Sequence, residues 1–537
     1  MRYAHTVEQV RAAEAALMAR VPEGTLMQRA AAGLAATCAE LLAGGPATGA
    51  AAVAEVGAGT GTGAGTAAGV KDEAAGWRGR RRGLRGSRVV VLAGSGDNGG
   101  DALFAGARLA ARGVAVRAVL LAPDHAHAAG LAALLAAGGA VTATVDEGEH
   151  EIGRADLVLD GIVGIGGRGG LRAPALPYVR AARRAGVPVV AVDLPSGVDA
   201  DTGEVAGEAV RATVTVTFGT HKPGLFIDPG AQHAGVVRLV EIGIEPPAPV
   251  VEVLRHADVA ALLPRPTAES DKYRRGVVGV AAGSERYPGA AVLAVSAALR
   301  GGAGAVRYAG TAAREVVRAH PETLVSAGGP KAAGRTQAWV VGPGLADGAE
   351  AERTLEEALA AGVPTLVDAD GLRLLARRSG DPARRAREHG ALLLTPHAGE
   401  AVALLAGAGE TATADQVAAA RLRYARRIAE LYGCTVLLKG STTVVAGPDP
   451  AVAARVNPTG TPWLATAGSG DVLSGLAGSL LAAGLAPLDA ASTAAYLHGL
   501  AGRIASGGGD TGGGRAPITA SDVAAALPAA WRNVTGP

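Results

Sequence analysis

The sequence predicts an α/β protein built from two doubly wound domains. Short apolar strands alternate with Ala-rich helical segments through both halves of the 537 residues, which is typical of a mostly parallel sheet covered by helices. A chain of this length also exceeds what one hydrophobic core supports. Pro clusters within residues 244–266 indicate a linker, so we expect one domain over residues 1–245 and another over residues 250–537.

Composition narrows the class of protein further. Hydrophobic residues make up 49% of the chain and aromatic residues only 3%, so the cores must be built from Ala, Val and Leu. The formal net charge of +2 gives no general attraction to nucleic acid or to an acidic membrane. Cys38 and Cys434 cannot form a disulfide framework, and the apolar stretch at 473–485 is too short to span a bilayer. We therefore expect a soluble cytoplasmic protein without membrane or nucleic-acid partners.

The first 87 residues divide into a helical part and an insertion. Thr6 with Gln9 resembles a capping box at the start of a helix, and residues 27–42 form a second Ala-rich helical pattern. Residues 43–87 are of low complexity and end in an arginine cluster. This cluster is either a nucleic-acid patch or a solvated loop, and the lack of interleaved aromatic residues favours the loop.

Regular structure returns with a strand at 88–93, which leads into the sequence GSGDNGGD at 94–101 and a helix at 102–112. A strand, a glycine-rich loop and a helix in this order are typical of phosphate binding at the edge of an α/β sheet. Within the loop, Asn98 and Asp101 offer oxygen atoms that suit a cation or sugar hydroxyls. Further strands of the first domain are expected at 114–121, 157–160, 187–193 and 213–218.

Two of these strands end on carboxylates that precede glycine-containing loops, Asp160 and Asp193. Ligands of doubly wound sheets bind beyond the carboxyl ends of the strands, so both acids are candidate site residues. The alternative is that each acid only caps its loop. Two such acids together with the 94–101 loop favour a site.

The second half repeats the α/β pattern. Strands are expected at 277–282, 339–342, 365–368, 391–395 and 435–439, with a helix at 290–300 between the first two. No tandem repeat relates the two halves.

Near the end of the second half, Gly468-Ser469-Gly470-Asp471 leads into an apolar helix. The N-terminus of a helix presents free N–H groups and suits an anion, and the glycines allow a phosphate to approach closely. A carboxylate at this place makes chemical sense if Asp471 removes a proton from a hydroxyl that attacks the phosphate. Alternatively, Asp471 only caps the helix.

Several motifs, in order, resemble those of the bifunctional NAD(P)H-hydrate repair enzymes. In the first half these are GSGDNGGD, LVLDGIVGIG at 157–166, AVDLPSGVDADTG at 191–203 and TVTFGTHKPGLF at 215–226. In the second half they are VVGPGL at 340–345, DADGL at 368–372, LLTPHAGE at 393–400, LLKGSTTVV at 437–445 and NPTGTP followed by GSGD. The resemblance implies a Rossmann-like hydrate epimerase domain fused to an ADP/ATP-dependent dehydratase domain of the ribokinase-like superfamily.

The resemblance also implies roles for individual residues of the epimerase domain. The substrate-binding residues would be Asp97, Asn98, Gly99, Gly100, Asp101, Gly164, Ile165, Gly166, Gly167, Arg168, Gly169, Gly170 and Asp193. A potassium ion would lie near Asn98, Asp160 and Ser196, and Asp193 would be catalytic.

In the dehydratase domain, the resemblance implies that Ala290, Gly344, His397 and the catalytic Asp471 face the hydrate. Lys439, Gly440, Ser441, Thr442, Thr443 and Gly470 would contact ADP or ATP. Mg²⁺ is expected with the nucleotide, because phosphoryl transfer requires charge neutralisation.

The resulting hypothesis is a metabolite-repair enzyme. The first domain would interconvert the R and S hydrates of NADH or NADPH, and the second would dehydrate the S hydrate with ADP or ATP, releasing phosphate. We expect a homo-oligomer that binds only small molecules. Two alternatives remain open: a ribokinase-like kinase of a vitamin precursor, or a first domain that binds nucleotide or RNA without catalysis.

Overall fold

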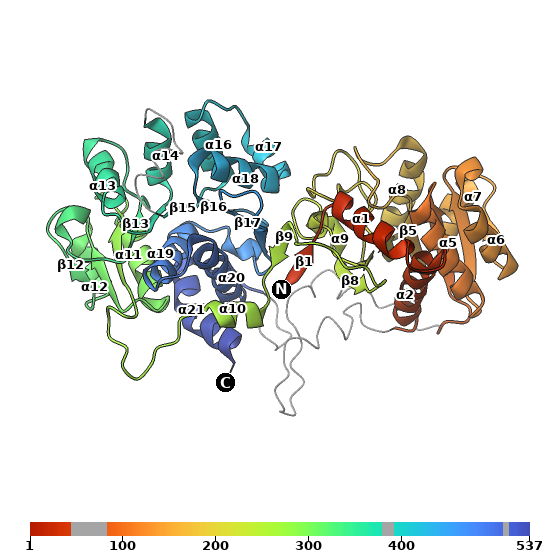
Figure 1. Cartoon of the computed structure of the whole chain (residues 1–537), viewed down its shortest axis with the longest axis horizontal. Coiled ribbons are helices and arrows are strands. Elements are labelled where there is room, and N and C mark those ends of the chain that lie inside the picture. Colours follow the sequence, from red (N-terminus) through yellow and green to blue (C-terminus); the bar gives the residue numbers. More distant parts are fainter. Residues whose placement is uncertain (45–82, 379–390, 508–514, 537) are drawn as a thin grey trace. The chain divides into compact units, whose positions relative to one another are not determined.

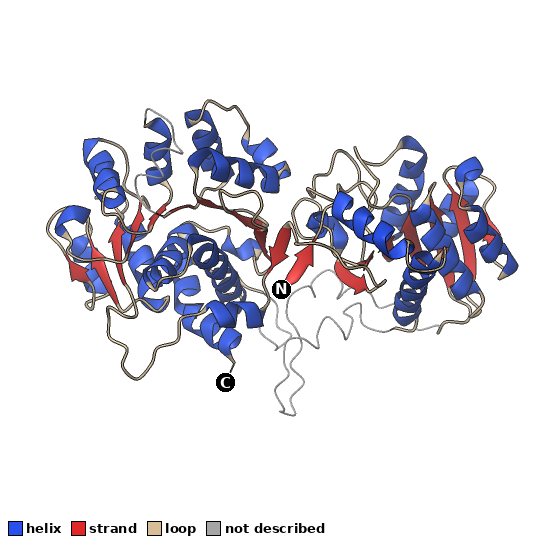
Figure 2. Ribbon diagram, viewed as in Figure 1, coloured by secondary structure: helices blue, strands red, loops and turns tan. Residues whose placement is uncertain are grey.

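The computed structural model describes residues 1–44, 83–378, 391–507 and 515–536. It divides into two compact units, one formed by Tyr3–Val250 and the other by Met1–Arg2 together with Val251–Pro537. Both units are mixed α/β, with helices packed along the strands of a sheet (Figure 2). The predicted fold class of two doubly wound α/β domains is therefore confirmed.

The N-terminal unit contains a parallel sheet of seven strands in the order β4-β3-β2-β5-β6-β7-β8. These strands are β2 (Arg88–Ala93), β3 (Ala115–Leu120), β4 (Ala140–Val141), β5 (Leu157–Gly161), β6 (Val189–Val192), β7 (Val214–Phe218) and β8 (Val236–Val240). A short strand, β1 (Arg2–Ala4), precedes the helices. The helices are α1 (Val7–Met18), α2 (Thr25–Leu42), α5 (Asp97–Ala110), α6 (Ala128–Ala136), α7 (Val145–Gly153), α8 (Leu176–Ala185) and α9 (Ala231–Ala234). Helices α2, α5 and α6 pack in one apolar cluster, and α7 and α8 pack in another.

Helix α1 begins as the sequence predicts, because Thr6 and Gln9 form a reciprocal capping box. The helix after β2, by contrast, begins at Asp97, so the predicted start at Ala102 is wrong. Gly99 lies within this helix, at a place where a Cβ atom would lie 2.3 Å from the carbonyl oxygen of Gly94. The glycines of residues 94–101 therefore have two effects: they allow the loop to form, and they allow the start of the helix to pack closely against the backbone.

The C-terminal unit contains a larger sheet in which ten strands follow the order β9-β18-β17-β16-β15-β14-β13-β10-β11-β12. These strands are β9 (Val251–Val253), β10 (Val277–Ala281), β11 (Ala305–Tyr308), β12 (Leu324–Val325), β13 (Ala338–Val341), β14 (Thr365–Val367), β15 (Leu392–Leu394), β16 (Thr435–Leu438), β17 (Thr443–Ala446) and β18 (Ala454–Asn457). Only β17 runs antiparallel to its neighbours β16 and β18.

Helices cover both faces of this sheet. Figure 1 shows α13, α14, α16 and α18 along one face and α19, α20 and α21 along the other. Their bounds are α10 (His256–Leu262), α11 (Pro288–Arg300), α12 (Ala313–Ala319), α13 (Ala349–Leu359), α14 (Asp370–Arg377), α16 (Ala398–Gly407), α17 (Ala414–Ala419), α18 (Arg421–Tyr432), α19 (Ser469–Ala482), α20 (Pro487–Ala505) and α21 (Ala520–Thr535). No helix in the described part of the chain is long and apolar enough to cross a membrane.

The prediction of a linker over residues 244–266 is wrong for the second part of this range. Residues 251–253 form β9, which pairs in parallel with β18, and residues 256–262 form α10. The strand has only three residues and lies close to prolines, so its alternation was too short to recognise. The arginine-rich insertion predicted at 43–87 lies mostly outside the described residues.

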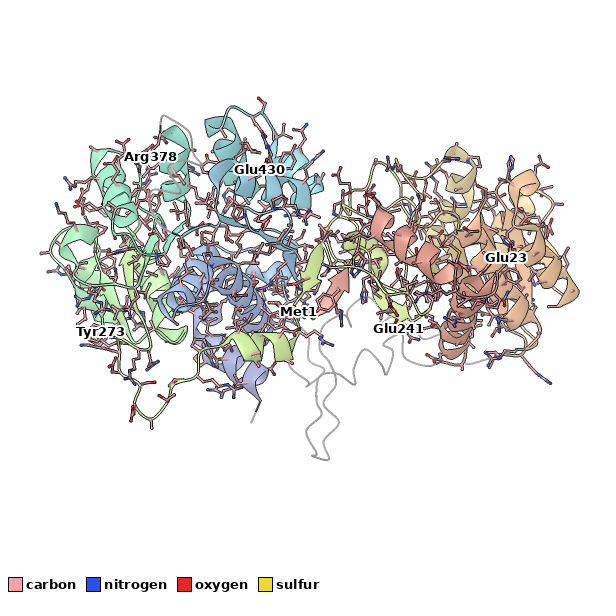
Figure 3. All side chains as sticks on the ribbon, in the orientation of Figure 1. Met1, Glu23, Glu241, Tyr273, Arg378 and Glu430 are labelled. Carbon is pink, nitrogen blue, oxygen red and sulfur yellow. The ribbon has the colours of Figure 1, made fainter. Side chains whose placement is uncertain are left out.

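The core of the C-terminal unit depends on small residues, whereas many of its charged side chains lie on the surface. Glu430, which Figure 3 labels, lies on α18. Its side chain is 65% exposed and pairs with Arg427 at 2.7 Å, and such surface pairs contribute about 0–1 kcal/mol. Inside, α11 and α19 approach so closely that a Cβ atom on Gly475 would lie 2.0 Å from the carbonyl oxygen of Ala294. This contact positions the helix that begins at Ser469.

We predict that Gly475→Ala destabilises the C-terminal unit by about 1–3 kcal/mol, because the new methyl group meets backbone atoms that cannot rotate away. Gly289→Ala, in α11, is the matched control, since a Cβ atom there meets nothing within 4 Å. Thermal unfolding of both variants tests the claim. Equal melting temperatures for Gly475→Ala and the wild-type protein would contradict it.

Candidate active sites

Each unit carries its candidate residues at the carboxyl ends of parallel strands. In the N-terminal unit, Asp160 is fully buried at the end of β5 and accepts hydrogen bonds from the Ser196 hydroxyl (2.6 Å) and the Ser196 N–H (2.8 Å). Burial raises the pKa of Asp160 to about 6. Asn98 lies in the same place, with its amide donating to the Val192 carbonyl (3.0 Å) and accepting from the Gly164 N–H (3.2 Å). The structure thus brings together the three residues predicted near a potassium ion.

These oxygen atoms fit a hard cation. The Ser196 hydroxyl lies within hydrogen-bonding distance of both the Asp160 carboxylate and the Val163 carbonyl (3.1 Å), yet it has one proton to donate. One of these two acceptors is therefore left without the Ser196 proton. A cation beside them would satisfy it.

The predicted glycine-rich loop lies directly after β5. It holds Gly164, Ile165, Gly166, Gly167, Arg168, Gly169 and Gly170. Gly169 and Gly170 have φ angles of 79° and 82°, and a Cβ atom on Gly170 would lie 2.1 Å from the Ala206 carbonyl oxygen. On Gly166, a Cβ atom would lie 3.4 Å from a guanidinium nitrogen of Arg11. Helix α1 therefore supplies a cation beside this loop.

Asp193 follows β6 and forms a buried ion pair. Its Oδ1 accepts from the Lys222 ammonium, from the Thr217 hydroxyl (3.1 Å) and from the Phe218 N–H (3.2 Å). Lys222 is 1% exposed. The backbone of Asp193 has a φ of 67°, which is uncommon for a residue with a side chain and is found often at functional sites.

The carboxylates of Asp101 and Glu14 interact electrostatically with this pair, and Asp97 interacts with both of them. Asp97 and Asp101 lie at the start of α5, and Glu14 lies on α1. Burial raises the pKa of Asp101 well above its usual value, and the charges of Asp193, Asp97 and Glu14 raise it further. One buried oxygen of Asp101 has no hydrogen-bond partner in the described structure. It is available to a bound ligand.

In the C-terminal unit, Asp471 lies in the first turn of α19, after Gly468. Burial raises the pKa of Asp471 to about 7, and the nearby Asp368 carboxylate adds to this effect. The carboxyl group therefore changes its charge near neutral pH. That property suits a general base better than a helix cap.

Lys439, predicted to contact a nucleotide, lies directly after β16 within a cluster of acids. Its ammonium donates to Asp368 Oδ1 (2.7 Å) and lies 3.7 Å from Glu400. Burial alone would lower the pKa of Lys439, but the Asp368 and Glu400 carboxylates outweigh it and raise the pKa. A Cβ atom on Gly470 would lie 3.5 Å from the same ammonium, so the structure brings Lys439 next to the residue that precedes Asp471.

The remaining predicted nucleotide-binding residues form the turn from β16 into β17. Gly440 and Ser441 are exposed, Thr442 is buried and Thr443 begins β17. The turn follows Lys439 directly. Ser441 therefore presents its hydroxyl group to solvent two residues after Lys439.

Of the predicted hydrate-binding residues, Ala290 and Gly344 lie together. A Cβ atom on Gly344 would lie 2.8 Å from the Ala290 Cβ and 3.1 Å from that of Tyr287. Gly468 contacts the same helix, because a Cβ atom there would meet Leu293 at 2.4 Å. Ala290 and Gly344 thus lie close to the turn that precedes Asp471.

His397, the other residue predicted to bind the hydrate, makes different contacts from Ala290 and Gly344. It is 54% exposed and caps α16, where its Nδ1 accepts from the Gly399 and Glu400 N–H groups at 3.0 and 3.2 Å. Because Nδ1 is an acceptor, the neutral ring carries its proton on Nε2. Glu400 connects His397 to Lys439, because its carboxylate lies close to both side chains.

Sequence reasoning missed several site residues. Asp368 ends a predicted strand exactly as Asp160 and Asp193 do, so the same signal was present. Lys222 and Glu400 lie within two of the motifs, but a lysine between His221 and Pro223 gives no sign of burial. Glu14 lies on an amphipathic helix, and a charged residue in such a pattern is predicted only to face solvent.

Two family models match separate parts of the chain. A family model described as NAD(P)H-hydrate dehydratase matches residues 278–511, and a model described as YjeF-related protein N-terminus matches residues 23–224. Among solved structures, an ADP/ATP-dependent NAD(P)H-hydrate dehydratase from Bacillus subtilis, co-crystallised with ATP and Mg²⁺, is 28% identical with a TM-score of 0.46, and the match covers 52% of this chain and 97% of that one.

Full-length relatives are more similar. The bifunctional NAD(P)H-hydrate repair enzyme of Mycobacterium leprae is 43% identical over 521 residues, which cover 97% of each chain. The enzyme of the same name from Mycobacterium tuberculosis is 44% identical over 492 residues, 92% of each chain. At this identity and coverage, the chain belongs to the family of bifunctional NAD(P)H-hydrate repair enzymes.

Proposed function

We propose that this chain repairs hydrated NADH and NADPH. The N-terminal unit interconverts the R and S hydrates, and the C-terminal unit dehydrates the S hydrate with ADP or ATP, which restores NAD(P)H and releases phosphate. Besides family membership, one observation carries the proposal: a carboxylate with a pKa of about 7 lies in the first turn of a helix, beside a lysine. A homo-oligomer in the cytoplasm is part of the same proposal.

In the C-terminal unit, Asp471 accepts the proton of the hydrate's hydroxyl group as that oxygen attacks the terminal phosphate. The N–H groups at the start of α19 stabilise the phosphate, with Gly470 allowing close approach. Lys439 and the turn to Thr443 hold the nucleotide. The bond between the ring carbon and the phosphorylated oxygen then breaks, phosphate leaves, and the neighbouring ring carbon loses a proton, so that the ring double bond of NAD(P)H forms. Ala290, Gly344 and His397 bind the hydrate.

Mg²⁺ accompanies the nucleotide in this proposal and neutralises phosphate charge. Among the described residues, no group of three or more His, Cys, Asp or Glu side chains could hold a metal ion. The phosphates themselves would therefore supply the main ligands, as is common for Mg²⁺.

In the N-terminal unit, Asn98, Asp160 and Ser196 hold K⁺, and the loop from Gly164 to Gly170 binds the hydrated nucleotide. Epimerisation at a carbon that bears a hydroxyl group needs one group to give a proton and another to take it. Burial raises the pKa of Asp101, which favours its protonated form, whereas Asp193 is paired with Lys222. We assign these two carboxyl groups to the proton transfers.

The function is tested by incubating chemically hydrated NADH, a mixture of both epimers, with the protein, Mg²⁺ and either ADP or ATP. In K⁺ buffer, NADH absorbance should recover fully with one phosphate released per NADH. When tetramethylammonium replaces K⁺, recovery should stop at the S fraction, because only dehydration continues. A stable phosphorylated alcohol would instead identify a small-molecule kinase, and full recovery without K⁺ would remove the ion from the site.

Asp471→Asn should abolish turnover while leaving the fold intact. An amide cannot take the proton, and general-base contributions are roughly 10²–10⁴-fold in rate. Ionised Asp471 destabilises the folded state above pH 7, because its pKa is raised by folding, and this penalty fades as pH falls toward 4. The variant should therefore melt no lower than wild type at pH 8.

Turnover and melting temperature are measured on the same sample. The helix-capping interpretation predicts near-normal turnover in Asp471→Asn and lower stability in Asp471→Ala. A stable Asn variant that keeps more than about a tenth of wild-type turnover would exclude Asp471 as the base.

A further inference from the structure

His498 connects α20 to the first turn of α19. The residue is 7% exposed, and its Nε2 lies 2.9 Å from the carbonyl oxygen of Ser469. A carbonyl oxygen can only accept a hydrogen bond, so Nε2 carries a proton and donates it. Burial lowers the pKa of His498 to about 4, so the ring is neutral near neutral pH and this is its single N–H donor.

The Ser469 carbonyl belongs to the same peptide unit as the Gly470 N–H. A trans peptide unit is planar, and its C=O and N–H bonds point in opposite directions. When His498 holds the carbonyl, the Gly470 N–H must therefore point away from the imidazole. The first hydrogen bond within α19 runs from the Val472 N–H to the Gly468 carbonyl (3.2 Å), so the helix supplies no acceptor for the Gly470 N–H.

Glycine makes this peptide unit easier to rotate. Gly470 has no Cβ atom, so its φ angle is less restricted than that of other residues. Rotation of the unit would place the Ser469 carbonyl oxygen where the N–H group had been, and that oxygen would repel a phosphate. A hydrogen bond to the carbonyl opposes this rotation.

We propose that His498 is a positioning residue for phosphoryl transfer: by holding the Ser469 carbonyl, it directs the Gly470 N–H toward the phosphate. The inference rests on the proposed function of the C-terminal unit, in which N–H groups at the start of α19 stabilise the phosphate. His498 acts through the peptide unit and touches neither the phosphate nor the hydrate's hydroxyl group in this account.

Other contacts fix α20 to the segment that precedes α19. The Thr459 hydroxyl donates to the Tyr496 carbonyl at 2.8 Å. The Arg503 guanidinium donates to the carbonyls of Pro458 (3.0 Å) and Gly460 (3.1 Å). These bonds remain when the imidazole is removed, so α20 should keep its place and the effect of the substitution should be local.

Thr493 provides a matched control on the same helix. It is fully buried, and its hydroxyl has no hydrogen-bond partner among the described residues. Thr493→Val therefore removes a buried polar group of α20 without removing a hydrogen bond. His498→Leu removes the donor at similar volume, whereas His498→Gln keeps an N–H group near the place of Nε2.

The first test measures kcat and KM for ATP, with the S hydrate and Mg²⁺, in wild type and the three variants. His498→Leu should lower kcat by about tenfold or more, which is part of the roughly 10²–10³-fold that one such donor contributes. KM for ATP should stay within about twofold, because the lost interaction is made mainly in the transition state. His498→Gln and Thr493→Val should remain close to wild type. An unchanged kcat in His498→Leu, or an equal loss in His498→Gln, would overturn the proposal.

The pH dependence separates positioning from acid–base chemistry. Because His498 stays neutral, the ratio of wild-type kcat to that of His498→Leu should be the same from pH 6 to pH 9. A ratio that changes with pH would assign His498 a proton-transfer role and overturn the proposal.

A further measurement does not depend on turnover. Hydrogen exchange, followed by mass spectrometry of peptides that span 465–475, reports the first turn of α19. Exchange there should be faster in His498→Leu, unchanged in His498→Gln and Thr493→Val, and unchanged elsewhere in the unit. Unchanged exchange at 465–475 in His498→Leu, or a rise throughout the unit, defeats this inference alone, whereas failure of wild type to dehydrate the hydrate defeats the proposed function.

Discussion

A carboxylate buried at the end of a parallel strand must be given hydrogen-bond donors, and this requirement shapes both units. Asp160 takes two donors from Ser196, and Asp193 takes the Lys222 ammonium. Asp368 is held by Lys439 and Ser474. Leaving any of them unpaired would cost several kcal/mol, about 3–5 for a broken buried pair. The donors come from neighbouring elements and thereby fix the ends of the strands where ligands of such sheets bind.

Other carboxyl groups in the same sites are left incompletely satisfied. Asp101 has a buried oxygen without a partner, and burial raises the pKa of both Asp101 and Asp471. A carboxyl group whose pKa is raised to about 7, as that of Asp471 is, can exchange a proton near neutral pH. Both units thus contain buried carboxyl groups with raised pKa values beside carboxyl groups that are paired, although their sheets differ in strand order.

Much of this arrangement could be predicted from the sequence, because strand-end acids and glycine turns are local signals. Asp160, Asp193 and Asp471 each follow a short apolar run or begin one. The partners could not be predicted in the same way, since Ser474 and Asp368 meet only through the fold. The helix that begins at Asp97 was also missed, because Gly99 serves a close contact with Gly94 that no propensity encodes. Roles for the site residues remain predictions.

The central claim is that buried acids hold Asp471 as a base that ionises near neutral pH. The most direct measurement is the pH dependence of kcat/KM for wild-type dehydration of the purified S hydrate with ATP. Because the base must be ionised, the rate should fall about tenfold per pH unit below an apparent pKa of about 7. A rate that stays constant down to pH 5 would contradict the account.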